Sequence, residues 1–235
     1  MLSFDEINRL AWNGNVRSMD ISQYINDMDG LTEPQREDRI AFAQQLENQL
    51  YGALSFLFLA TQYNLPNRRE QTIDMVENVF LTTISIFTVA DTFLTEYASR
   101  FAEEFVDATI RNQGNVFTED NPENVRGAYY FSEDRARYNA ENEANTVFNY
   151  EEFRDAKRSG FRYKQWITMH DERVRRTHGN VDGVIVPIDD YFIVGDAELL
   201  YPKDPDSGHP EEVINCRCVL RYISTEDYKK ILRAT

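Results

Sequence analysis

The side chains best suited to chemistry in this 235-residue chain are concentrated in its last third. His170, Asp171, Glu172 and His178 lie close together in sequence, and the chain's two cysteines follow further on. Imidazole and carboxylate groups can support general acid–base chemistry, including cleavage of RNA. Thiols together with an imidazole can instead bind zinc. The residue types therefore point to two kinds of site, one catalytic and one metal-binding.

A catalytic site receives little support from the rest of the sequence. No serine or cysteine has a base close by in sequence, no glycine-rich loop is spaced to hold phosphates, and no paired-carboxylate signature is present. A histidine in a charged turn more often serves as a hydrogen-bonding corner residue. We therefore predict that the chain is not an enzyme. The alternative is a small metal-dependent or histidine-based nuclease or toxin-like module that uses His178.

A metal site would use the cysteines. Cys216 and Cys218 are separated by one residue, a spacing at which a disulfide is strained. This spacing fits a reducing compartment or a metal site better than a secreted disulfide scaffold. With His178, and with His209 as a fourth ligand, the two thiols would form the Cys₂His₂ set that zinc favours.

The competing interpretation is a structural corner. Cys216 and Cys218 would then be small buried residues on either side of Arg217, whose guanidinium we expect to pair with Asp171 or Asp182. Such a pair would lock the turn after a first strand to the beginning of the last strand. The predicted corner residues are Trp166, Asp171, Arg173, Arg175, His178, Asp182, Gly183, Asn215 and Arg217.

Two long helices are predicted before this region. Thr32, Glu33 and Pro34 form a good helix start, and apolar residues at three- and four-residue steps continue to about Tyr63. A turn at residues 64–67 leads to a second run, from about Arg69 to Gln113, that contains no proline or glycine. The two runs most simply form an antiparallel hairpin. A short helix and an irregular acidic segment are expected within residues 1–30.

The rest of the sequence predicts one more helix and a small module of helices and strands. A charged helix from Ser132 to about Arg158 is expected to be solvated or to lie against a partner. Strands are predicted at Tyr163–Met169, Val181–Pro187 and Val219–Ile223, with loops over 189–215 and a closing helix at Glu226–Arg233. The predicted class is α+β, with a helical arm at 1–125, a charged connecting helix at 126–158 and an α/β module at 159–235.

The charge distribution bears on partners. The net charge is −15, and the first 110 residues hold 17 acidic against 7 basic residues. This acidity argues against a dedicated nucleic-acid binder. The exception is Arg154–Arg176, where 8 basic residues accompany 3 acidic ones, so this stretch is either a solvated surface or a contact for DNA or an acidic partner. The two apolar runs, Leu54–Ala60 and Val79–Ala90, are too short to span a membrane, and no signal peptide is expected.

The order and spacing of the motifs from Trp166 to Cys218 resemble the Mu F-like head morphogenesis family of tailed phages, the minor head proteins. The family resembles this chain in the order of its motifs. A strand carries Trp-x-x-x-x-Asp and is followed by Arg-Val, by a Cys-x-x-Cys or Arg-x-x-His pair and by Asp-Gly. Tyr-Pro-x-Asp-Pro and Asn-Cys-Arg-Cys come last. The matching residues are Trp166, Asp171, Arg173, Val174, Arg175, His178, Asp182, Gly183, Tyr201, Pro202, Asp204, Pro205, Asn215, Cys216, Arg217 and Cys218.

The resemblance implies a structural protein of the virion head that resides in the host cytoplasm before assembly. It implies portal or major capsid protein as partners, a homo-oligomer in the particle, and help with assembly, packaging or release of the genome. Arg154–Arg176 would then be the place for contact with packaged DNA. The family form with two upstream cysteines would carry a thiol at position 175, where this chain has Arg175, a cation that cannot ligate a metal. We therefore expect no cofactor, and zinc is the alternative.

Overall fold

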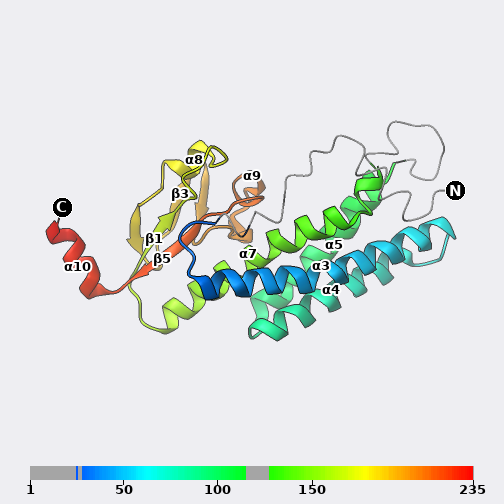
Figure 1. Ribbon diagram of the computed structural model, residues 1–235, viewed down its shortest axis with the longest axis horizontal. Coiled ribbons are helices and arrows are strands. Elements are labelled where there is room, and N and C mark those ends of the chain that lie inside the picture. Colours follow the sequence, from blue (N-terminus) through cyan, green and yellow to red (C-terminus); the bar gives the residue numbers. More distant parts are fainter. Residues whose placement is uncertain (1–24, 26–27, 115–126, 235) are drawn as a thin grey trace. The chain divides into compact units, whose positions relative to one another are not determined.

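The computed structural model describes residues 25, 28–114 and 127–234 (Figure 1). About 62% of the described residues are helical, and the long helices precede a small region of antiparallel strands. The predicted α+β class is confirmed. The expectations for residues 1–24 and for the linker at 115–126 lie outside the described residues.

The described residues form two compact units. The helical unit contains Ile40–Glu141, and the C-terminal unit contains Asn142–Thr235 together with the segment that ends at Arg39. Helices α3 (Glu33–Gln62) and α7 (Glu133–Arg158) each contribute residues to both units.

The helical unit is held together by aromatic rings from three helices: α3, α4 (Arg68–Phe87) and α5 (Thr92–Asn112). The rings of Phe42 and Phe80 have centroids 6.3 Å apart, and those of Phe80 and Phe101 are 4.8 Å apart. An ion pair of 2.7 Å joins Arg69, near the start of α4, to Asp107, near the end of α5. Successive helices therefore run antiparallel, and the hairpin predicted for residues 32–113 gains a third helix.

The prediction of one continuous helix from Arg69 to Gln113 was wrong. The chain leaves the helix at Thr88, whose backbone is extended, with φ −149°. The carboxylate of Asp91 then accepts a hydrogen bond from the backbone N–H of Leu94 at 3.0 Å and caps α5. An aspartate in this position satisfies one of the free donors of a helix start, so a polar residue with no proline or glycine nearby was enough to divide the run.

Helix α7 has the predicted extent, but the expectation of a solvated or partner-facing helix was wrong. Arg135, in the helical unit, is buried and donates to the carbonyls of Phe105 and Tyr130, each at 3.0 Å. Burial lowers the pKa of Arg135 to about 10. In the C-terminal unit, Asn145 and Asn149 on the same helix are also buried. The polar residues of α7 are accommodated by specific hydrogen bonds, which a hydrophobicity pattern does not reveal.

The C-terminal unit contains a three-stranded antiparallel sheet in the order β2-β1-β5 (Figure 1). The bounds are β1 Tyr163–Ile167, β2 Ile185–Pro187 and β5 Val219–Ile223, and Trp166 faces Leu220 in the register. A second pair joins β3 (Phe192–Val194) to β4 (Ala197–Leu199). The short helices are α8 (Arg176–Gly179), the 3₁₀ turn η1 (Pro205–Ser207) and α9 (Pro210–Val213), and α10 (Thr225–Ala234) follows β5.

The sequence predicted β1, β5 and the closing helix to within about two residues, but it missed β3, β4, η1 and α9, which lie in the segment expected to be loop. Trp166 is fully buried and lies edge-on to Phe192, with 5.1 Å between the ring centroids. Cys216 and Cys218 belong to the same core. None of the described helices is both long enough and apolar enough to cross a membrane.

A buried arginine links α3 to α7 within the C-terminal unit. The guanidinium of Arg39 donates to Asn145 and Asn149, each at 3.2 Å, and to the carboxylate of Glu152 at 2.8 Å. The side chain of Arg39 has no exposed surface. Its removal would leave a carboxylate and two amide oxygens without their shared donor.

We predict that Arg39→Met lowers the free energy of unfolding by about 3–5 kcal/mol, because removing one member of a buried ion pair leaves the other uncompensated. Urea unfolding followed by circular dichroism measures this change. The control is Arg158→Met, which removes an arginine that is 67% exposed and should cost less than about 0.5 kcal/mol. Equal effects of the two substitutions would contradict the structural role of Arg39.

Candidate functional site

The predicted corner is built where the segment after β1 meets the segment before β5. Arg217 donates from Nη2 to the carboxylate of Asp171 at 2.7 Å, and Arg173 donates to the same carboxylate at 3.2 Å. The hydrogen bond from Arg217 holds the pKa of Asp171 below its usual range. Of the two partners considered from the sequence, Arg217 therefore pairs with Asp171.

Asp182 has a different role, because its carboxylate binds Thr168, the residue that follows β1. Its carboxylate accepts hydrogen bonds from the backbone N–H of Thr168 at 2.8 Å and from the Thr168 hydroxyl at 3.0 Å, and it lies 2.8 Å from His170 Nε2. Burial acts to raise the pKa of Asp182, but these hydrogen bonds outweigh it and the pKa is lowered. Gly183 has φ +74° and donates to the carbonyl of Trp166 at 2.8 Å. The Asp-Gly turn is thus fastened to the strand that carries Trp166.

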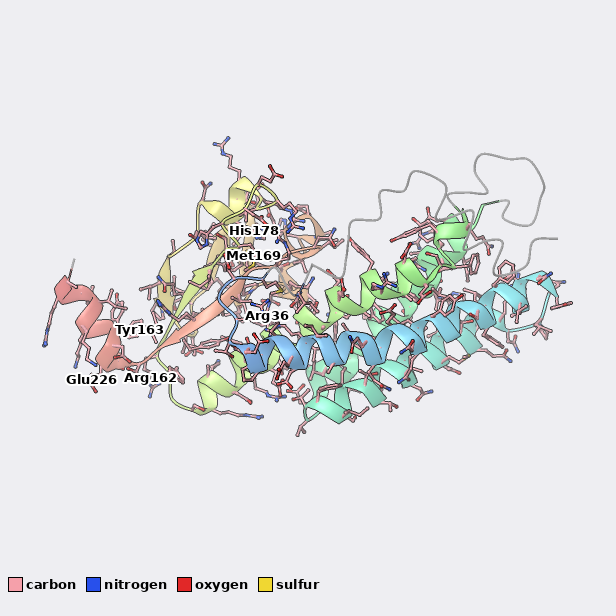
Figure 2. The ribbon with its side chains drawn as sticks, in the orientation of Figure 1. Arg36, Arg162, Tyr163, Met169, His178 and Glu226 are labelled. Carbon is pink, nitrogen blue, oxygen red and sulfur yellow. The ribbon has the colours of Figure 1, made fainter. Side chains whose placement is uncertain are left out.

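His178 lies between the two cysteines and a glutamate. Its Nδ1 atom is 3.4 Å from Cys218 Sγ and 3.6 Å from Cys216 Sγ, and its Nε2 atom is 3.0 Å from Glu212 Oε2. The imidazole is presented by the short helix α8, and all four residues are buried. Figure 2 shows His178 at the same end of the C-terminal unit as Met169, while Tyr163 at the start of β1 lies toward the other end.

The carboxylate of Glu212 is itself held in position. The hydroxyl of Thr177 donates to Glu212 Oε2 at 2.8 Å. Gly195, in the turn between β3 and β4, has φ +62°, and a Cβ atom at this position would come within 2.7 Å of Glu212 Oε1. Glycine at 195 therefore meets two requirements at once, because it permits the left-handed backbone and leaves room for the carboxylate.

The two thiols are electrostatically unequal. Burial acts to raise the pKa of Cys216, but hydrogen bonds with Cys218 and His178 and the charges of His178 and Lys203 outweigh it, and the pKa lies well below its usual range. The hydrogen bond with Cys216, together with burial, raises the pKa of Cys218. Burial also acts to lower the pKa of His178, but its contact with Cys216 prevails and raises it. The pKa shifts of the two thiols have opposite signs, so Cys216 is the more acidic of the pair.

Several loop residues complete the surroundings of Cys216. Lys203 is fully buried and donates to Asn142 Oδ1 at 2.6 Å, and the backbone N–H of Asn215 donates to the same oxygen at 3.2 Å. Asn215 has φ +60°, a conformation that asparagine tolerates better than most residues. Arg175 donates to the carbonyl of Ile214. These contacts fix the chain immediately before the Cys-Arg-Cys segment.

The structure brings most of the predicted site residues together, as several small groups with different partners. His209 does not join them, because its ring hydrogen-bonds to Glu211 at 2.9 Å and it is not in the His178 group. Sequence reasoning missed Glu212, which lies on the short helix α9 in a segment expected to be loop, and Lys203, which occupies the variable position of the Tyr-Pro-x-Asp-Pro motif.

No base lies close to either cysteine in sequence, but the fold brings His178, 38 residues away, next to Cys216. A nucleophile also needs access to a substrate, and Cys216 is only 2% exposed. The neighbouring imidazole alone therefore does not make Cys216 a catalytic nucleophile.

Half of the eight basic residues in the stretch Arg154–Arg176 have a carboxylate partner within the C-terminal unit. Arg154 and Arg158 pair with Asp155, Lys157 pairs with Asp189 at 2.6 Å, and Arg173 pairs with Asp171. Lys164 is buried, its ammonium donates to the carbonyl of Leu200, and burial lowers its pKa to about 8. Much of this charge therefore has internal partners.

Comparison with known families agrees with the motif pattern. Residues 103–221 match the family described as Phage Mu protein F like protein, a segment that extends from α5 through α7 to β5. The chain belongs to this family, a family of phage head proteins. Membership suggests a role in phage head morphogenesis and a place in the virion head. Searches of curated proteins and of solved structures returned no significant match.

We predict that Gly195→Ala destabilises the protein more than Gly208→Ala does. Both glycines have positive φ, but a Cβ atom at 208 meets open space, so Gly208→Ala reports only the backbone strain of about 1–2 kcal/mol. Crowding of Glu212 should add about 1–3 kcal/mol for Gly195→Ala. Urea unfolding midpoints measure the difference, and indistinguishable midpoints would show that the position of Glu212 is not tightly constrained.

Proposed function

We propose that the chain is a structural minor head protein of a tailed phage that docks on portal or capsid protein and assists head assembly, genome packaging or genome release. The observation that carries this proposal is the family match over residues 103–221. Within that match, the motif residues make internal contacts: Asp171 pairs with Arg217, Tyr201 is buried beside Phe153, and Asp204 accepts from two backbone N–H groups. Residues that make such internal contacts maintain the fold. This role of the motif residues favours a structural protein over an enzyme.

The helical unit is the surface that we assign to docking. Large apolar side chains are exposed near the end of α3 and at the connection between α4 and α5: Leu59 is 48% exposed, Tyr63 70%, Ile86 59% and Val89 75%. Aromatic and aliphatic side chains are common anchors of protein–protein interfaces. Because α3 and α4 run antiparallel, the Leu59–Tyr63 pair and the Ile86–Val89 pair lie at opposite ends of the helical unit. A partner that covers either pair would gain hydrophobic free energy, and a homo-oligomer in the particle would use the same chemistry.

The nuclease alternative has no comparable support. His178 is 2% exposed, and both of its ring nitrogens face buried protein atoms. Contact of Arg154–Arg176 with packaged DNA remains a secondary proposal, and it rests on those arginines in the stretch that face solvent.

We predict that the chain co-purifies with heads of the phage that encodes it and captures that phage's portal or capsid protein. Leu59→Ser combined with Tyr63→Ser should weaken this capture at least about tenfold, because loss of two apolar anchors costs more than about 1.4 kcal/mol. The control pair, Tyr191→Ser with Ile193→Ser, removes exposed apolar residues of the C-terminal unit and should leave capture unchanged.

Mass spectrometry of purified heads and quantitative capture on immobilised portal or capsid protein are the measurements. Absence of the chain from heads, or unchanged capture by the helical-unit variant, would refute the docking assignment. Cleavage of labelled RNA or DNA by the purified wild-type protein would instead support the nuclease alternative.

A further inference from the structure

We propose that His178, Cys216 and Cys218 bind one zinc ion, with His178 coordinating through Nδ1. This proposal differs from the expectation of no cofactor drawn from the sequence, and it does not depend on the proposed docking function. The three side chains are the group among the described residues whose ligand atoms all lie within 4.8 Å of one another.

The distances fit a shared ion. With Zn–S bonds of about 2.3 Å and Zn–N bonds of about 2.0–2.1 Å at tetrahedral angles, a thiolate sulfur and an imidazole nitrogen on one zinc lie about 3.6 Å apart. The corresponding distances from His178 Nδ1 are 3.4 Å to Cys218 Sγ and 3.6 Å to Cys216 Sγ. A single N–H would be directed at one sulfur, whereas Nδ1 is almost equally distant from both. Near-equal spacing is what coordination to a common centre requires.

Glu212 supplies the support that a metal-binding histidine normally has. Such a histidine donates its other ring N–H to a carboxylate or carbonyl, which fixes the tautomer and the orientation of the ring. Here Nε2 lies 3.0 Å from Glu212 Oε2, and donation from Nε2 leaves the lone pair of Nδ1 facing the two sulfurs. Thr177 and Gly195 in turn position Glu212. This arrangement extends over α8, α9 and the β3–β4 turn.

The donor set and its charges select the metal. Two thiolates and one imidazole favour zinc over calcium or magnesium, which prefer oxygen ligands. Two thiolates neutralise the charge of Zn²⁺, so the nearby cations do not face a net positive centre. Arg175, which weighed against zinc in the sequence, hydrogen-bonds to the carbonyl of Ile214, and Lys203 hydrogen-bonds to Asn142.

The site is buried, so no substrate could reach an ion there, and we therefore assign the ion a structural role. Cys216 is 2% exposed, Cys218 4% and His178 2%. Three protein ligands leave one position of a tetrahedral ion, which we assign to a water molecule. A zinc ion here would join α8 to the start of β5, and its binding free energy would add to the stability of the C-terminal unit.

The test is metal analysis of the full chain purified under reducing conditions, followed by titration of metal-free protein with Co²⁺. We expect one zinc per chain and a thiolate-to-cobalt absorption band. Cys216→Ser and Cys218→Ser should each remove the bound zinc, while His209→Ala, which alters the histidine outside the group, should retain it. Glu212→Gln should keep the stoichiometry but weaken zinc affinity about 10–100-fold, as measured by competition with a chelator.

Folded wild-type protein that has two free thiols, contains no zinc and gives no cobalt band would overturn the proposal. This outcome is decisive even if the serine variants fail to fold, because it uses the native chain alone. Rapid alkylation of Cys216 in such metal-free protein would point instead to a reactive thiolate–imidazolium pair. Unchanged zinc affinity in Glu212→Gln would remove the supporting role of the carboxylate.

Discussion

A buried imidazole must have both of its ring nitrogens satisfied, and in the C-terminal unit this requirement determines how three segments meet. His178 reaches Glu212 through Nε2 and the two cysteines through Nδ1. Burying a polar group without a hydrogen-bond partner can lower the stability of the fold by several kcal/mol. Helix α8, the end of α9 and the segment just before β5 must therefore come together for any one of them to be correctly placed.

Helix α7 meets the remaining polar requirements of the same region. The amide of Asn149 donates to the carbonyls of Pro202 and Cys218, at 3.1 and 3.2 Å, and its oxygen accepts from Arg39. Asn142 accepts from Lys203 and from the backbone of Asn215. A helix with few large apolar residues thus becomes a central element, because its amide side chains take the place of backbone partners that irregular loops lack. Such a network specifies one arrangement more strongly than apolar contact does.

The sequence predicted those features that depend on local patterns. Alternation and turn residues located β1 and β5, and Thr32-Glu33-Pro34 located the start of α3. The motif order identified the family, and the residue types limited the partner of Arg217 to Asp171 or Asp182, of which the structure shows Asp171. The break at Asp91 was missed because a single capping aspartate has no large effect on a long apolar pattern.

Features that depend on contacts distant in sequence were not predictable in the same way. Glu212 is separated from His178 by 34 residues, and Asn149 from Cys218 by 69, so no spacing rule connects them. The burial of α7 was also missed, because hydrophobicity does not distinguish a solvated asparagine from one with buried partners. The sequence offered a group of His178 with both cysteines only as one of two interpretations. The fold shows that the three side chains do lie together.

The central claim is that His178, Cys216 and Cys218 form one metal-binding corner that organises the C-terminal unit. X-ray absorption at the zinc edge of the purified chain tests this most directly, because it reports the atoms bound to the ion. We expect two sulfur neighbours at about 2.3 Å and nitrogen or oxygen neighbours at about 2.0–2.1 Å. Zinc surrounded only by nitrogen and oxygen, or a folded protein with no zinc to absorb, would contradict it.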